Sequence, residues 1–260
     1  MIRVEDLVTY YGERRILNHV NLDIQAGETR VILGGSGTGK STLLRHIIRL
    51  ENPSGGHIFI KNHDICHMPE ERFNLLRPKI GMLFQSAALF NSMTVEENVS
   101  LPLRELTQLE DSTIRIMTRI KLDLVGLSGF ENYMPSQLSG GMRKRAGLAR
   151  ALAMDPEILL FDEPSAGLDP ITAAGIDSLI VKLKRAFKMT IVVVTHEMAS
   201  AFMIADRITV MDQGEVIATG TPEEIRASQH PRVIQFLNRV PEDEARDAQA
   251  YLRTLTQSSF

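Results

Sequence analysis

A glycine-rich segment near the N-terminus constrains the fold more than any other feature of this chain. Residues 34–41 read GGSGTGKS; they follow the apolar run Thr29–Leu33 and lead into an apolar helical pattern from Lys40 to Leu50. A strand that turns through glycines into a helix aims backbone N–H groups and the positive end of the helix dipole at one point, which suits a phosphate. The pattern predicts an α/β fold with a phosphate-binding loop. Its residues are Gly34, Gly35, Ser36, Gly37, Thr38, Gly39, Lys40, Ser41 and Thr42.

Short apolar runs bounded by turn residues indicate the other strands. The runs Leu159–Phe161 and Ile191–Val194 are continuously apolar, which is typical of parallel strands buried on both faces. The early strands have an antiparallel character, and Asp212-Gln213-Gly214 predicts a hairpin turn. The expected strands are Ile2–Val8, Val20–Ile24, Thr29–Leu33, His57–Ile60, Ile80–Phe84, Ile158–Phe161, Thr190–Val194, Ile208–Met211 and Val216–Ala218.

The middle of the chain carries helix signals in place of strand patterns. Thr94 and Glu97 form a capping box, and residues 111–125 space their apolar side chains as a helix does. We therefore expect a mixed-sheet core with an antiparallel β subdomain at 1–86 and 154–226, a helical subdomain at 87–153 and a helical tail at 227–260. Within the tail, a helix from Glu242 to about Thr256 is expected to pack on a partner copy.

Composition excludes several classes of protein. The formal net charge of -3 provides no general field for nucleic acid, and the single cysteine, Cys66, excludes an internal disulfide framework. The first ten residues alternate polar and apolar side chains, unlike a signal peptide, and no run reaches the roughly 18–20 apolar residues that span a bilayer. We expect a cytosolic protein that reaches any membrane through a partner.

A second motif gives the phosphate loop a chemical context. The run Ile158–Phe161 ends in two carboxylates, Asp162 and Glu163. Beside bound phosphates, Lys40 would neutralise charge, while Ser41 and Asp162 would hold Mg²⁺. Glu163 would orient or deprotonate an attacking water. The sequence therefore predicts hydrolysis of a nucleoside triphosphate.

The sequence Leu138-Ser139-Gly140-Gly141-Met142 resembles the LSGGQ signature of ATP-binding-cassette (ABC) ATPases, with Met142 replacing glutamine. The resemblance implies a P-loop NTPase of ABC type that binds ATP and Mg²⁺ in a sandwich homodimer. It also implies that Ser139, Gly140 and Gly141 contact the γ-phosphate held by the partner copy. Taken alone, the same residues could be a serine-capped helix start.

Other landmarks of this family follow in order. Gln85 matches the glutamine that senses Mg²⁺ and water, and Asp169 closes a loop, residues 165–169, that reaches across the dimer. His196 matches the histidine that contacts the γ-phosphate. Tyr11 matches the aromatic residue that stacks on adenine, although Tyr10 could serve instead. The implied partners are two membrane-spanning permease subunits.

Three segments resemble the Mla/Mce lipid-transport group more closely: Phe84–Val99, Leu138–Leu152 and Pro231–Leu237. This implies an ATPase at the cytoplasmic face of the inner membrane that drives phospholipid transport with Mce-domain proteins. The segment Ala87–Leu103 would receive the coupling helix of the permease, although its apolar residues, Leu89, Phe90, Met93 and Leu101, could equally be core. The alternatives are an importer for another cargo, such as amino acids, and a non-transport ABC ATPase acting on DNA or ribosomes, whose usual insertions are missing here.

Two polar clusters favour ordinary surface roles. The segment His63–His67 offers metal-capable side chains but lacks the four spaced ligands of a structural site, so we expect a solvated loop. The cations Arg143, Lys144, Arg145 and Arg150 form a basic run without interleaved aromatics. We expect a solvated helix face there.

Overall fold

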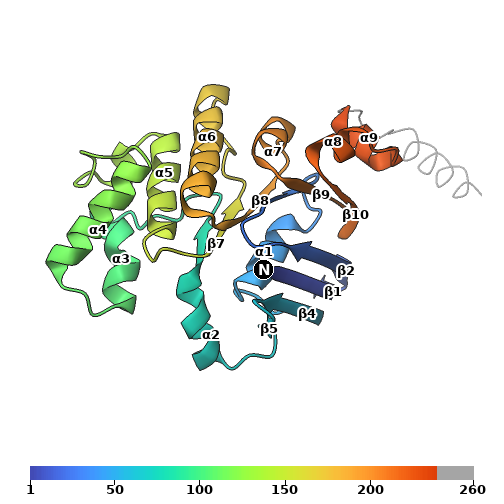
Figure 1. Cartoon of the computed structure of the whole chain (residues 1–260), viewed down its shortest axis with the longest axis horizontal. Coiled ribbons are helices and arrows are strands. Elements are labelled where there is room, and N and C mark those ends of the chain that lie inside the picture. Colours follow the sequence, from blue (N-terminus) through green and yellow to red (C-terminus); the bar gives the residue numbers. More distant parts are fainter. Residues whose placement is uncertain (239–260) are drawn as a thin grey trace, which may run out of the picture.

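The computed structural model describes residues 1–238 and contains two β-sheets with helices around them (Figure 1). The strands are β1 Ile2–Tyr11, β2 Arg14–Ile24, β3 Thr29–Leu33, β4 Gly55–Ile60, β5 His63–Asp64, β6 Ile80–Leu83, β7 Ile158–Asp162, β8 Thr190–Thr195, β9 Arg207–Asp212 and β10 Glu215–Gly220. The α-helices are α1 Lys40–Ile47, α2 Glu70–Leu76, α3 Val95–Leu106, α4 Asp111–Leu124, α5 Gly140–Ala151, α6 Pro170–Phe187, α7 Met198–Ile204, α8 Pro222–Arg226 and α9 Pro231–Leu237.

The larger sheet has six strands in the order β10-β9-β3-β8-β7-β6. All pairs are parallel except the hairpin of β9 and β10. Strand β3 lies between β8 and β9, which come more than 150 residues later, so the phosphate loop leaves the sheet from its centre. The carboxyl ends of β3, β7 and β8 meet at one edge because these strands run in the same direction.

Both faces of this sheet are buried, as continuous apolar strands require. In β8, Ile191 and Val193 pack into a core with α5, α6 and α7, whereas Val192 and Val194 pack into a second core with α1 and the smaller sheet. Strands β3 and β7 divide their side chains in the same way. The two-residue repeat of a strand thus distributes one apolar run between two cores.

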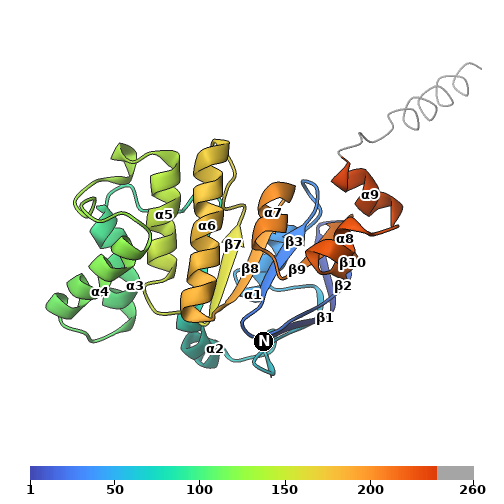
Figure 2. The ribbon, with the colours of Figure 1, turned by 45° about the horizontal axis from the view of Figure 1, so that its top comes forward.

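The smaller sheet is antiparallel, with the order β2-β1-β4-β5. It lies across the α1 side of the larger sheet in both views (Figures 1 and 2). Helix α1 is enclosed between the sheets through Leu43, Leu44 and Ile47. This enclosure fixes the helix whose first turn follows the phosphate loop.

Helices α3, α4 and α5 lie together at the far side of β6 and β7, away from the smaller sheet (Figure 2). The predicted capping box at Thr94 and Glu97 is confirmed, since each side chain bonds the other residue's backbone N–H. None of the helices within residues 1–238 combines the length and apolarity needed to cross a bilayer.

Several expected elements have different bounds. Strand β2 begins at Arg14, earlier than the expected Val20, because it pairs with β1 from Tyr11 onward. The helix expected to reach Leu50 ends at Ile47, since Arg49 adopts a left-handed backbone conformation. Strand β5 and helix α2 were not expected, and the strand at Ile80 ends one residue before Phe84. The expected tail helix from Glu242 lies outside the described residues.

The predicted hairpin turn at 212–214 is confirmed. Gln213 and Gly214 both have positive φ, as a two-residue turn of the primed type needs. Another capping box, formed by Thr221 and Glu224, begins α8. Side chains that cap their own helices satisfy N–H groups that would otherwise be left without partners.

Candidate nucleotide site

The phosphate loop is shaped by its last glycine and by its lysine. Gly39 has a φ of 94°, and a Cβ there would lie 2.6 Å from Leu17 Cδ2, so the turn into α1 accepts only glycine. Lys40 Nζ donates to the carbonyl oxygens of Gly34 (2.9 Å) and Gly35 (2.7 Å), which closes the loop on itself. The ammonium therefore lies inside the curve where phosphate oxygens would bind.

Lys40 carries its charge in a shielded position, since its side chain is almost fully buried. Burial lowers the pKa of this lysine, while the negative charges of Glu163 and Asp162 act in the opposite direction. A triphosphate would supply additional negative charge to the same pocket. The loop thus presents a desolvated cation at the position where anionic oxygens would bind.

The acidic pair lies at the carboxyl end of β7, next to the start of α1. Ser41 Oγ donates to Asp162 Oδ1 at 2.7 Å, so a hydroxyl from one element and a carboxylate from another share one point. Mg²⁺ prefers oxygen ligands of this kind and is commonly held by one or two protein groups together with phosphate oxygens. These residues fit the expected metal.

Glu163 follows at the end of the strand in a left-handed backbone conformation, with φ 48°. Its carboxylate accepts a hydrogen bond from Thr195 Oγ1 (3.2 Å) and lies 3.0 Å from His196 Nδ1. Both of these residues stand at the end of β8, the neighbouring strand. The sheet therefore brings the expected acid and histidine into contact, and it adds Thr195, which the sequence analysis did not single out.

Gln85 and Tyr11 lie at the border of the site and are exposed. Gln85 lies two residues after the end of β6, and its carbonyl accepts from the Lys144 ammonium. Tyr11 borders a hollow of about 230 Å³ together with Gly37, Lys40 and Ser41, and its hydroxyl donates to Glu51. Tyr10 does not line this hollow, which favours Tyr11 as the aromatic residue beside a bound base.

The signature segment forms the start of a helix. The two interpretations of Ser139, as part of a signature motif and as a helix cap, are therefore compatible with the same structure. Ser139 caps α5, and its Oγ accepts from Met142 N at 3.3 Å, while Gly140 begins the helix. Asp169 likewise caps α6 and is exposed. Within residues 1–238, neither Ser139 nor Asp169 hydrogen-bonds to the phosphate loop of the same chain. They face outward, as groups offered to another copy would.

The expectation of a solvated basic face on α5 is wrong for Lys144, Arg145 and Arg150, whereas Arg143 is exposed as expected. Lys144 is only 5% exposed, and its ammonium donates to the backbone. Arg145 donates to the Val125 carbonyl, and Arg150 donates to the carbonyls of Ala87 and Ala88. These acceptors lie between 19 and 63 residues away in sequence, which is why spacing alone could not reveal them.

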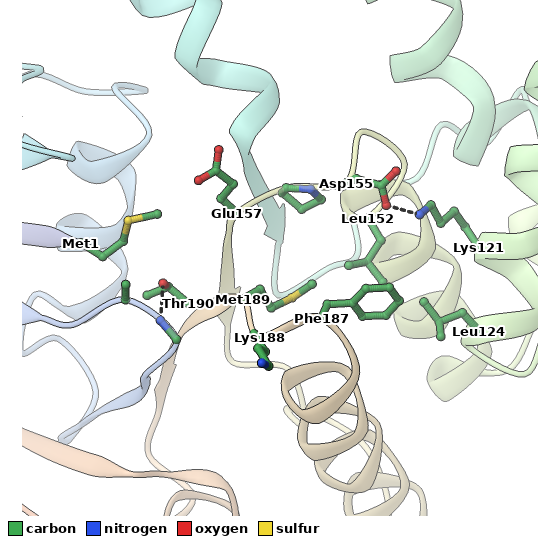
Figure 3. A pocket seen from close by; sticks show the side chains of 13 residues that line it. Met1, Lys121, Leu124, Leu152, Asp155, Glu157, Phe187, Lys188, Met189 and Thr190 are labelled. Carbon is green, nitrogen blue, oxygen red and sulfur yellow. Dashed lines mark hydrogen bonds and ion pairs between the residues drawn. The ribbon is translucent and has the colours of Figure 1, made fainter.

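A second hollow, of about 360 Å³, lies at the opposite edge of the larger sheet (Figure 3). Thr190 and Glu157 in its wall stand at the amino ends of β8 and β7, and the ion pair between Lys121 and Asp155 forms its far side. Because the phosphate loop follows the carboxyl end of β3, this hollow is not part of the nucleotide site.

The segment His63–His67, expected to be a solvated loop, contacts His57 of β4 through Asp64. Asp64 Oδ2 lies 2.8 Å from His57 Nδ1 and 2.9 Å from His67 Nδ1, and Asp64 belongs to β5. The three residues form a group of possible metal ligands that the sequence analysis missed, because His57 comes from another strand. Both imidazoles are exposed and already bonded to the carboxylate.

Comparisons with known proteins agree with this geometry. The family model described as ABC transporter matches residues 17–166. The intermembrane phospholipid transport system ATP-binding protein MlaF of Haemophilus influenzae is 41% identical over 258 residues, which cover 98% of both chains. The probable ribonucleotide transport ATP-binding protein mkl of Mycobacterium leprae is 44% identical over 237 residues, covering 91% of this chain and 68% of that protein.

Solved structures give the same fold. A dimeric, post-hydrolysis structure of the ATP-binding cassette MJ0796 bound to ADP and Pi superposes with a TM-score of 0.79 at 35% identity, covering 85% of this chain and 99% of that one. The expected fold class and family are therefore confirmed, and the chain belongs to the ATP-binding subunits of ABC transporters.

Proposed function

We propose that this chain hydrolyses ATP to drive phospholipid transport between membranes as the ATPase subunit of an ABC transporter. The observation that carries the proposal is the meeting of Ser41, Asp162, Glu163 and His196 at one edge of the sheet, beside the buried lysine of the phosphate loop. Each of these groups has a distinct task in phosphoryl transfer.

The residues of one chain divide the work of binding and hydrolysis. The loop from Gly34 to Thr42 cradles the phosphates through its N–H groups, and Lys40 offsets their charge. Tyr11 stacks on the base. Ser41 and Asp162, with Gln85 nearby, would hold Mg²⁺, which would neutralise part of the phosphate charge when bound.

Hydrolysis needs a water aimed at the γ-phosphate and a group that accepts its proton. Glu163 takes this role, because its carboxylate is held in place by Thr195 and His196. Its left-handed backbone turns the side chain away from the direction that the strand alone would give it. His196, which lies beside this carboxylate, contacts the γ-phosphate in this proposal.

The active form in this proposal is a homodimer. Ser139, Gly140 and Gly141 at the start of α5 complete the partner's ATP site with N–H groups, a hydroxyl and the helix dipole, and Asp169 lies in the loop that meets the partner. Support comes from the outward orientation of these caps and from the dimeric relative, of which this chain covers 99%.

An apolar groove gives the permease a place to dock. The groove, of about 560 Å³, lies between the core and α3, and Phe90, Leu101 and Leu106 are among its lining residues. Phe90 and Leu106 are 51% and 57% exposed, which is costly for large apolar side chains without a cover. We propose that the coupling helix of each permease subunit lies here, over the expected segment from Ala87 to Leu103.

The cargo is proposed from likeness, since an ATPase subunit does not contact what is transported. The alignment with MlaF covers 98% of both chains, whereas the alignment with mkl, named as a probable ribonucleotide transport ATP-binding protein, covers 68% of that protein. Phospholipid is therefore the first candidate, with Mce-domain proteins as further partners and the cytoplasmic face of the inner membrane as the location. An importer for another small solute is the second candidate.

Glu163→Gln tests the chemistry. The amide keeps the size of the side chain but accepts no proton, so we expect hydrolysis to fall about a hundredfold or more with ATP affinity retained and the ATP-bound dimer stabilised. Phosphate release and size-exclusion chromatography with ATP measure both effects. Near-normal turnover would refute the assigned role.

The cargo is tested separately on the assembled transporter. Purification with the membrane partners, followed by mass spectrometry of bound lipid, should recover phospholipid. ATP should change phospholipid transfer between vesicles in the wild type and not in Glu163→Gln. ATP hydrolysis that responds to a soluble solute-binding protein and not to phospholipid would favour the second candidate.

A further inference from the structure

Helix α5 carries a buried lysine that the mechanism above does not use. Lys144 lies about one turn after Ser139, Gly140 and Gly141, which start the same helix. Its ammonium donates to the backbone carbonyl of Gln85 and, at 3.1 Å, to the carbonyl of Glu163. One side chain of the helical subdomain therefore touches the main chain of two residues assigned to hydrolysis.

The burial of this cation is unusual, because an ammonium group is seldom withdrawn from water without a carboxylate partner. None of the ion pairs recorded within residues 1–238 includes Lys144, whose direct acceptors are neutral carbonyls. Burial lowers the pKa of Lys144, while the nearby charges of Asp162 and Glu163 favour its protonated form. The catalytic carboxylates thus help to hold the lysine charged where it lies.

The two acceptors follow neighbouring strands of the larger sheet, since β6 and β7 pair in parallel. Gln85 lies in the segment between β6 and α3, and Glu163 directly follows β7. Lys144 spans 59 residues of sequence to reach the first and 19 to reach the second. A displacement of α5 relative to the core would pull on both carbonyls together.

We propose that Lys144 is a positioning residue that couples the start of α5, where the partner's ATP binds, to Gln85 and Glu163 of its own chain. Engagement of the partner's γ-phosphate by Ser139, Gly140 and Gly141 fixes α5, and Lys144 then fixes the main chain of both hydrolytic residues. Each site of the dimer is thereby completed only when the opposite site is filled. This inference rests on the proposed ATPase function.

The closest matched control is Lys121, a second buried lysine of the helical subdomain. It is 7% exposed and pairs with Asp155 at the opposite edge of the sheet, far from the phosphate loop (Figure 3). Lys121→Met removes a buried ammonium from the same subdomain without touching the nucleotide site. Lys144→Arg keeps a cation that can donate to two carbonyls at once.

The test compares Lys144→Met, Lys144→Arg, Lys121→Met and the wild type in the full-length chain assembled with its membrane partners. For Lys144→Met we expect kcat for ATP hydrolysis to fall at least tenfold. The KM, the affinity for a fluorescent ATP analogue and the dissociation constant of the ATP-dependent dimer should each stay within threefold of the wild-type value. The reason is that the lost interaction acts on the transition state. Lys144→Arg should recover most of kcat, and Lys121→Met should change kcat less than threefold.

Three results would overturn the inference. The first is a kcat of Lys144→Met within threefold of the wild type. The second is a loss of nucleotide affinity and dimerisation in parallel with kcat, which a purely structural role would give. The third is an equal loss of kcat in Lys121→Met. A wild-type chain that does not hydrolyse ATP would instead refute the proposed function itself, so the two failures are distinguishable.

Discussion

The buried ion pair of Arg30 and Glu28 at the start of β3 allows a stability prediction with a defined magnitude. Their side chains are 3% and 7% exposed, and Arg30 Nε lies 2.7 Å from Glu28 Oε1. The other guanidinium nitrogens donate to Thr209 Oγ1 on β9 (2.9 Å) and to the Asp23 carbonyl on β2 (2.8 Å). The Arg30 side chain thus links β3 to β9 in the same sheet and to β2 in the smaller sheet.

Arg30→Met fills a similar volume but leaves the Glu28 carboxylate buried, with the Gln25 backbone N–H as its one remaining hydrogen-bond donor among residues 1–238. Removal of one member of a buried pair costs about 3–5 kcal/mol. A domain is typically stable by only about 5–15 kcal/mol, so the variant should unfold at a clearly lower urea concentration. The double variant Glu28→Gln with Arg30→Met should recover about 1–3 kcal/mol of this loss, since no charge is left stranded.

The chain contains no tryptophan, so unfolding is best followed by far-UV circular dichroism in urea. Arg104→Met serves as the control, because Arg104 and Asp111 form an exposed pair, 43% and 69% exposed, that should contribute less than about 1 kcal/mol. ATP affinity should be unchanged in Arg30→Met, since Arg30 lies roughly 10 Å of strand before the phosphate loop. A cost below about 1 kcal/mol, or a double variant no more stable than the single one, would refute the reasoning.

Two further predictions concern single side chains. A Cβ at Gly34 would lie 2.4 Å from the Met211 carbonyl oxygen, whereas one at Gly35 would meet nothing closer than 3.9 Å. Gly34→Ala should therefore lower ATP affinity at least tenfold, and Gly35→Ala should change it less than threefold; equal effects in a nucleotide titration would contradict this. Burial lowers the pKa of His46 from 6.5, so only the unfolded chain gains its proton just below pH 6.5. The unfolding free energy should then fall as pH drops below 6.5, by at most about 1.4 kcal/mol per pH unit from this residue, and His46→Gln should flatten that slope in urea titrations.

The sequence predicted the parts of the fold whose causes are local. The strand Thr29–Leu33 has the expected bounds, because an apolar run followed by glycines leaves little choice of conformation. The capping boxes at Thr94 and Thr221 were also predictable, since both partners lie within three residues. Strand β5 was missed because its two residues gain their conformation from pairing with β4 and not from their own propensity.

In the candidate site, too, only the features with local causes could be predicted. Its glycines, lysine and acidic pair are contiguous in sequence and could be identified there, whereas the contacts of Glu163 with Thr195 and His196 depend on which strand lies next to β7. The inward orientation of Lys144, Arg145 and Arg150 on α5 could not be predicted, because their acceptors are backbone carbonyls distant in sequence. Backbone acceptors carry no signal in the side-chain sequence, so buried donors of this kind resemble solvated ones until a structure is known.

The central position of β3 has a consequence for how the chain is made. Its neighbours in the sheet arrive late: Gly27 bonds to Thr190, 163 residues later, and Thr29 bonds to Asp206, 177 residues later. At translation rates of about 5–20 residues per second, the strand waits on the order of ten to thirty seconds on the ribosome before either edge can be covered. During this interval an apolar β-strand with open edges is a target for aggregation, and non-local pairing of this kind folds slowly. Nascent chains should therefore depend on chaperones until β9 has emerged.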